Sequence, residues 1–171
     1  MNESRSRVIR SGRIENDNWL GFAAVDAFPP GGSVFVDQPG WVLPLPLWKA
    51  CRARLSGRRH PPAVWLDAGT DPTTLLEDGR LIFPPDDIAF IAIDFSGHAD
   101  RRGHALARAL RDRHGWRGEL RAVGDVRVET VHALSQAGFD SFTIRPGHDP
   151  LQALAALEGC PPVCGPGPRR A

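Results

Sequence analysis

Short apolar segments alternate with longer segments of helical periodicity along most of the 171-residue chain. Runs of apolar and β-prone residues predict strands at about 33–37, 63–67, 88–94, 119–123 and 141–144. The run at 88–94 is continuously apolar rather than alternating, which is typical of a strand that is buried on both faces.

The segments between these strands have the apolar spacing and the start signals of helices. Residues 45–55 carry apolar side chains at helical spacing, and Pro44 and Pro46 are compatible only with the entrance of that helix. Asp-Pro pairs at 71–72 and 149–150 predict two further helix starts, with aspartate as the N-cap and proline in the first turn. A helix is also expected over about 126–138.

The helix after the central strand is expected at about 100–114. Its inward stripe has the spacing i, i+3, i+4, i+7 and consists of Gly103, Leu106, Ala107 and Leu110. Gly103 has no side chain, so this end of the helix can approach the sheet closely. Gly115 ends the helix.

This alternation predicts a single three-layer α/β domain over residues 1–159, with a mostly parallel sheet of about five strands flanked by helices. A small N-terminal β-hairpin is expected around Ser11-Gly12, after a loose segment at residues 1–6. A partial (β/α) barrel is the alternative architecture. Residues 160–171 form a tail rich in Pro, Gly and Arg.

The composition excludes several classes of protein. A net charge of +1 argues against general nucleic-acid binding, and no apolar run reaches the roughly 18 residues of a membrane span. The N-terminus has no apolar signal core, so we expect a cytoplasmic location, where cysteines stay reduced. Cys160 and Cys164 in "CPPVC" are a weak metal or redox signal, and the bland interpretation is a frayed tail.

Charged residues follow the predicted strands at one edge of the sheet, where ligands bind in parallel α/β folds. These strand-end residues are Asp37, Asp67, Asp94, Asp125 and Arg145. Together with Asp100 they would face one crevice, as a magnesium site or as paired acid–base groups. The alternative is that each aspartate only caps a turn or helix, because aspartate is preferred at such positions.

The stretch "FSGHADRRGH" leads from the central strand into its helix and is the candidate anion site. The first helical turn offers free N–H groups, and two adjacent guanidinium groups add charge. The anion-binding candidates are Arg102, Arg101, Gly103, His98 and His104. The alternative is a solvated, arginine-rich helix start with Asp100 as its N-cap.

Common cofactor and catalytic motifs are missing from the sequence. It has neither a G-x-G-x-x-G nor a G-x-x-x-x-G-K-[ST] loop, and no G-x-S-x-G elbow. The histidines show no H-x-x-x-H spacing, so we predict no metal site and no cofactor.

Several blocks resemble the bacterial domain-of-unknown-function family 934, namely "LPLPLWKACRARL", "IAIDFSGHADRRGHALARALRDRHGWRGELRAVGDV" and "AGFDSF". The resemblance extends to about residue 159, and "GELRAVGDV" is its most specific block. Members of this family are often described as oxidoreductases involved in sulfite reduction. The resemblance therefore implies an accessory role in assimilatory sulfate reduction, with the haem-containing sulfite reductase as partner.

The chain departs from the family pattern at several positions. Where the family usually has D-G-R-G-Y-S, this chain keeps Asp100, Arg102 and Gly103 but has Arg101, His104 and Ala105. Arg108 also matches, whereas Ser96-Gly97 and residues 127–130 differ from the pattern. These departures put in doubt whether the chain retains the family's activity.

Two functions follow as hypotheses. The first is an accessory protein of sulfite reduction that binds a small oxyanion or docks on sulfite reductase. The second is an enzyme that acts on a sulfur-containing or phosphorylated small molecule through the strand-end carboxylates and arginines. The missing cofactor motifs favour the first, because side chains alone do not supply redox chemistry.

Overall fold

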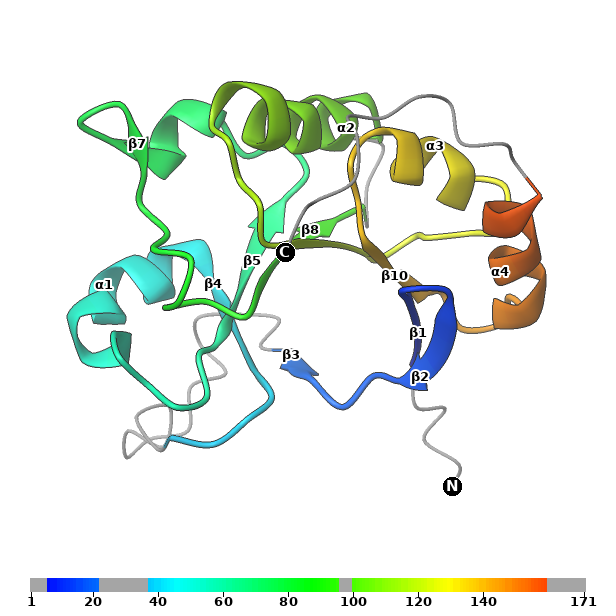
Figure 1. Ribbon diagram of the computed structural model, residues 1–171, viewed down its shortest axis with the longest axis horizontal. Helices are drawn as coiled ribbons and strands as arrows, with labels where there is room; N and C mark the ends of the chain where they lie inside the picture. The colour runs from blue at the N-terminus through cyan, green and yellow to red at the C-terminus, as the bar shows by residue number, and fades with distance from the viewer. Residues whose placement is uncertain (1–5, 22–36, 96–99, 160–171) are drawn as a thin grey trace, which may run out of the picture.

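The computed structural model describes residues 6–21, 37–95 and 100–159. Within them, the strands of one large sheet lie in the order β2-β1-β10-β9-β8-β5-β4-β3 (Figure 1). Neighbours from β3 to β10 are parallel. These parallel strands are β3 Leu20–Gly21, β4 Trp41–Pro44, β5 Ala63–Asp67, β8 Phe90–Asp94, β9 Glu119–Val123 and β10 Ser141–Ile144.

A hairpin of β1 (Arg7–Arg10) and β2 (Arg13–Asn16) completes one side of the sheet, with β1 antiparallel to β10. Ser11 and Gly12 form its turn with φ values of 51° and 72°. Two successive left-handed residues are the geometry of a tight type I′ hairpin turn, which matches the right-handed twist of the strands.

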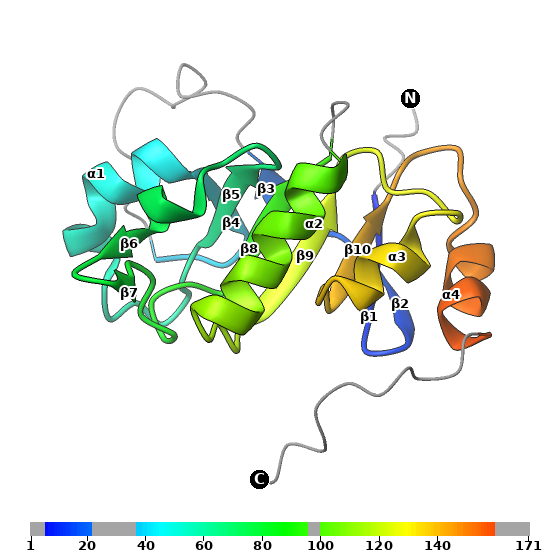
Figure 2. The same ribbon diagram turned by 90° about the horizontal axis from the view of Figure 1, so that it is seen from above.

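Four α-helices follow one another around one face of this sheet (Figure 1). They are α1 Leu45–Leu55, α2 Asp100–Arg108, α3 Val131–Gln136 and α4 Pro150–Glu158. A π-helical turn, η4 (Ala109–Arg113), continues α2. The 3₁₀ turn η3 (Pro72–Leu75) and the small hairpin of β6 (Leu76–Glu77) and β7 (Arg80–Leu81) follow β5. Figure 2 shows α2 lying along the middle of the sheet.

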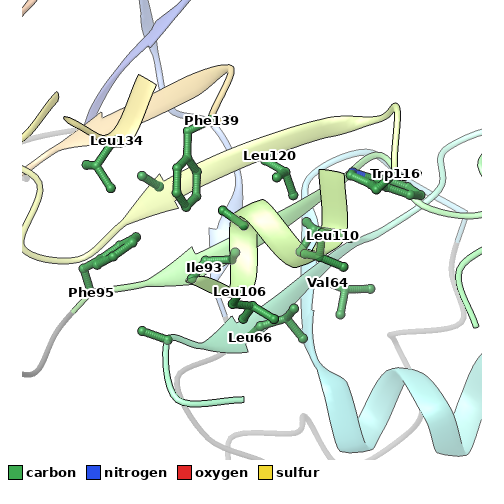
Figure 3. Close-up of a cluster of buried hydrophobic side chains, with 14 of the residues drawn as sticks. Val64, Leu66, Ile93, Phe95, Leu106, Leu110, Trp116, Leu120, Leu134 and Phe139 are labelled. Carbon is green, nitrogen blue, oxygen red and sulfur yellow. The ribbon is translucent and has the colours of Figure 1, made fainter. Parts of the chain in front are cut away.

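The two faces of the sheet carry different clusters because successive strand residues point in opposite directions. On the helix side, Leu106 of α2 and Leu110 of η4 pack with Val64, Leu66 and Ile93 of the strands (Figure 3). The other face carries Val42, Ala63, Phe90 and Ala92, against which Trp19 and Trp65 pack. The central strands are thus buried on both faces, as the continuous apolar run at 88–94 predicts.

The predicted α/β domain with a mostly parallel, helix-flanked sheet and an N-terminal hairpin is confirmed. The bounds of β5, β9, β10 and α1 agree with the predicted segments. The strand order, which the sequence left open, follows the order of the chain in the parallel part of the sheet. This order is shared with the alternative architecture, because each parallel strand of a (β/α) barrel also neighbours the next one in sequence.

Asp37 does not lie at the carboxyl edge of the sheet, so that prediction is wrong. The residue precedes β4, and its carboxylate accepts hydrogen bonds from the backbone N–H groups of Arg59 and His60 ahead of β5. It therefore lies toward the amino ends of the parallel strands. A Pro-Gly turn at 39–40, with Gly40 at φ 99°, separates Asp37 from the strand that was missed, Trp41–Pro44.

Some predictions fall outside the described residues. They concern most of the strand at 33–37, the loose N-terminus, His98 in the loop at 96–99, and the tail with Cys160 and Cys164.

Arg111, in η4, ties the end of the long helix to two neighbouring segments. Its guanidinium donates hydrogen bonds to the backbone carbonyls of Gly138, Trp116 and Gly118, at 3.0, 2.8 and 2.8 Å. It also pairs with the carboxylate of Asp140. Only 13% of the Arg111 side chain is exposed, so the guanidinium has little access to water. The guanidinium thus anchors the helix that carries the candidate anion site.

We expect Arg111→Lys to lower the free energy of unfolding by about 3 kcal/mol, because a single ammonium cannot satisfy three separated carbonyls and a carboxylate. Urea denaturation measures this change. Arg117→Lys is the matched control, because Arg117 is exposed nearby on the chain. Equal stability of the two variants would contradict an anchoring role.

Candidate functional site

The carboxyl ends of the parallel strands bring most of the predicted strand-end residues to one edge. Asp67 at the end of β5 is the register partner of Asp94 at the end of β8. The guanidinium of Arg145, after β10, donates a 2.6 Å hydrogen bond to Asp125, after β9. The predicted common edge is therefore confirmed for these four residues.

Asp125 is held between two arginines. Arg127 and Arg145 both pair with its carboxylate, and Arg127 engages both carboxylate oxygens. The Arg127 hydrogen bonds, followed by that from Arg145, lower the pKa of Asp125 from 3.8 to about 2. Asp125 and Arg145 thus link the loop after β9 to the loop after β10. The group of Asp125, Arg127 and Arg145 is called the clasp at Asp125.

Two other aspartates at this edge act as turn caps. Asp67 accepts a 2.7 Å hydrogen bond from the backbone N–H of Gly69. Asp71 accepts hydrogen bonds from the backbone N–H and the hydroxyl of Thr73, which lower its pKa below the usual 3.8. The capping alternative raised for the strand-end aspartates therefore describes Asp67, whereas Asp71 is the N-cap that the Asp-Pro pair predicts, here of the 3₁₀ turn η3.

A cavity of about 530 Å³ opens between the segment after β5 and the flank of α2 and η4. Its lining combines apolar residues with charged groups from both sides. The lining residues are Ala68, Gly69, Thr70, Asp71, Pro72, Arg102, Ala105, Leu106, Arg108, Ala109, Asp112 and Arg113. Volumes of about 300–1,000 Å³ are typical of sites for small molecules.

Arg102 lies at the end of this cavity nearest the strand ends. Its guanidinium lies against Gly69, where a Cβ atom would come within 2.9 Å of Arg102 Nη1 and of Asp67 Oδ1. Among the residues that the structure describes, no carboxylate forms an ion pair with Arg102. The Arg102 guanidinium can therefore lie close to the loop after β5 because residue 69 has no side chain.

Gly103 has the packing role that the sequence predicts. A Cβ atom on Gly103 would come within 2.4 Å of Phe95 Cε1 and 3.2 Å of Ala68 Cβ. The Phe95 ring, labelled in Figure 3, is buried and occupies the space next to this glycine. The predicted close approach of the helix to the sheet is confirmed at this glycine.

The other described candidates of "FSGHADRRGH", His104 and Arg101, do not line the cavity. His104 is half-buried, and its ring packs edge-to-face on Phe95 with centroids 5.7 Å apart. Arg101 is exposed. Asp100 begins α2. Of the predicted anion ligands within residues 6–21, 37–95 and 101–159, only Arg102 lines the cavity.

Sequence analysis missed Arg108 and Arg113, which line the same cavity. Both stand on the flank of α2 and η4 that also carries Arg102, with Ala105 between Arg102 and Arg108, and Ala109 between Arg108 and Arg113. The sequence signal that could have identified these residues is a row of arginines along one helix with alanines between them. In an arginine-rich chain, such a row is a weak indication of a binding site.

A second charged cluster lies on the other face of the sheet, around the buried Arg121. Its guanidinium lies 2.9 Å from a Glu119 oxygen, 3.4 Å from one of Asp17, and 3.8 Å from the centre of the Phe90 ring. Ser141 bonds to both Glu119 and Arg121. The carboxylates of Glu119 and Asp17 compensate the buried charge of Arg121. Because Asp17 belongs to the N-terminal segment, this cluster holds that segment on the sheet.

Comparison with known families matches residues 63–162 to a family described as "Bacterial protein of unknown function (DUF934)". The matched segment is more than half of the chain. The chain belongs to this family. All residues that line the cavity lie within the part that this DUF934 match covers. The comparison with curated proteins finds no match.

Two further findings concern the described part of the chain. It contains no helix whose length and apolar character would suit a membrane crossing. In residues 6–21, 37–95 and 100–159, no three His, Cys, Asp or Glu side chains come together as a metal-binding group would require.

We expect Gly103→Ala to destabilise the protein by about 1–3 kcal/mol, because the added methyl group collides with the buried Phe95 ring. An alanine in an exposed helix would instead stabilise by up to about 1 kcal/mol. Thermal denaturation measures the change. Phe95→Leu supplies the control, because the smaller side chain should reduce the cost of Gly103→Ala in the double variant. Equal costs in both backgrounds would exclude the collision as the cause.

The clasp at Asp125 should stabilise the fold only above acidic pH. The folded-state pKa of about 2 lies below the ordinary 3.8, so the contribution is complete above about pH 4 and disappears as the pH falls toward 2. About a third of the Asp125 side chain is exposed, so we expect Asp125→Asn to cost no more than about 1 kcal/mol at neutral pH. Melting temperatures of both proteins across this range provide the test. A gap that persists at the acidic end would contradict it.

Proposed function

We propose that this protein binds a small oxyanion in the cavity between the segment after β5 and α2, with Arg102 as the principal ligand. The observation that supports the proposal is the position of the Arg102 guanidinium. It lies in the wall of a cavity, against a glycine, and without an ion-pair partner in the described part of the chain. Guanidinium groups hold oxyanions through paired, parallel hydrogen bonds.

The surroundings of Arg102 favour one orientation of this side chain. Gly103 brings α2 close to Phe95 and Ala68, and Gly69 leaves space for the guanidinium on the facing loop. Asp67 lies beside the same glycine and carries a negative charge that opposes an anion. The proposed site therefore combines a positioned cation with a nearby carboxylate that limits its affinity.

The finer proposal concerns the role of this binding. We propose an accessory role in sulfur assimilation, in which the oxyanion is sulfite or sulfate and the partner is cytoplasmic sulfite reductase. Its support is the resemblance of the "IAIDFSGHADRRGH" and "GELRAVGDV" blocks to a family associated with sulfite reduction. Co-purification with sulfite reductase is expected. Sulfite reduction by the isolated, colourless protein would contradict the accessory role.

We expect Arg102→Ala to weaken binding of sulfate or sulfite by about 10- to 150-fold, which corresponds to the loss of a charged hydrogen bond of about 1.5–3 kcal/mol. Isothermal titration at low ionic strength measures the affinity, because salt screens an exposed charge. The melting temperature should stay nearly unchanged, since the side chain is exposed.

Arg101→Ala is the matched control for this titration. It removes the same charge from the same helical turn, but Arg101 does not line the cavity, so its effect should be small. Asp67→Asn should strengthen binding, because it keeps an oxygen for the Gly69 N–H and removes the opposing charge. Equal losses in the two arginine variants, or no binding of either anion at millimolar concentration, would disprove the proposed site.

A further inference from the structure

The cavity is longer than a single inorganic oxyanion requires. Its lining positions run from Arg102 to Arg113 along one flank of α2 and η4. At a helical rise of 1.5 Å per residue, these two positions lie on the order of 15 Å apart. Because the Arg102 guanidinium is turned toward Gly69 at the strand-end side, an anion bound there is remote from Arg113.

The charges along this flank fall into three zones. Arg102 lies at one end and Arg113 at the other, and neither forms an ion pair with a described residue. Between them stand Arg108 and Asp112, which carry opposite charges. On the facing segment, Asp71 adds a second carboxylate to the lining. The cavity thus has an arginine at each end of the helical flank and charges of both signs elsewhere in its lining.

The middle of the cavity is lined by apolar groups from both walls. Leu106, Ala105 and Ala109 belong to the helix, and Ala68 and Pro72 belong to the segment after β5. A volume of about 530 Å³ with such a lining is typical of a site for an organic molecule, whose body buries apolar surface. A hydrated inorganic ion gains nothing from this part of the cavity.

We infer that the cavity also binds an elongated organic molecule that has an anionic group at each end and an apolar or weakly polar body between them. This inference rests on the proposed function, because it assigns one of the two anionic groups to Arg102. Arg113 is then the second anion-binding residue, and the apolar wall carries the body of the ligand. The separation of the two arginines makes ligand length a determinant of specificity.

The probes for this inference are alkane disulfonates and the monosulfonates of the same chain lengths, with propane, hexane and decane as the spacers. Each is titrated into the full-length protein by calorimetry, together with sulfate. We expect the best disulfonate to bind at least about 10-fold more tightly than its matched monosulfonate, as a second charged hydrogen bond would provide. The advantage should depend on chain length and be absent for the propane spacer.

Variants at the two ends of the cavity assign the two sulfonates. Arg113→Ala should abolish the advantage of the disulfonate and leave sulfate affinity unchanged, whereas Arg102→Ala should weaken every probe. Arg117→Ala, which removes an exposed arginine outside this cavity, is the control for the change in net charge.

The outcomes separate this inference from the proposed function. If sulfate binds in an Arg102-dependent manner but disulfonates of all lengths bind no better than monosulfonates, only the two-anion ligand is overturned. If Arg113→Ala weakens sulfate itself, both arginines converge on one anion and the inference is also overturned. If sulfate and sulfite do not bind at all, the proposed function fails first.

Discussion

The contact between Gly103 and the Phe95 ring determines where the rest of the candidate site lies. Phe95 follows the central strand and is 3% exposed, with its ring packed against Phe139 and His104 as well as α2. A helix without a side chain at this position can approach the strand end until its backbone meets the ring. This close packing directs Leu106 and Leu110 into the core, and it leaves Arg102 on the flank that faces Gly69.

Three of the carboxylates at the carboxyl edge have local hydrogen-bond partners. Asp125 is shared by Arg127 and Arg145, Asp67 accepts a hydrogen bond from Gly69, and Asp71 caps the turn at Thr73. A crevice of free carboxylates, as a magnesium site or an acid–base pair would need, has no support from these three residues. Arg102 differs from the clasped arginines because its neighbouring surface is a glycine.

The sequence predicted the elements whose residues are either continuously apolar or regularly spaced. β5, β9 and β10 are short strands whose residues are mostly buried. α1 has apolar residues at helical spacing, and prolines mark its start. β4 was missed because Pro44 was assigned to the entrance of the helix, although it is also the last residue of a buried strand. The hairpin of β6 and β7 was missed because two-residue strands carry no periodicity.

The candidate site was only partly predictable for a different reason. Arg102 and the strand-end edge could be identified from local sequence and from the geometry of parallel sheets. The cavity could not, because it depends on how the segment after β5 faces a helix some 30 residues later, a distance in sequence that no local pattern encodes. The same limitation applies to Arg111, whose partners at Gly138 and Asp140 become neighbours only in the folded chain.

A crystal structure of the protein with selenate, located by its anomalous scattering, tests the central claim most directly. We expect selenate beside the Arg102 guanidinium, in the cavity between Gly69 and α2, with Arg127 and Arg145 still paired to Asp125. Selenate bound at Arg127 or Arg145 with none at Arg102, or a cavity free of selenate at saturating concentration, would contradict the claim that Arg102 forms the anion site.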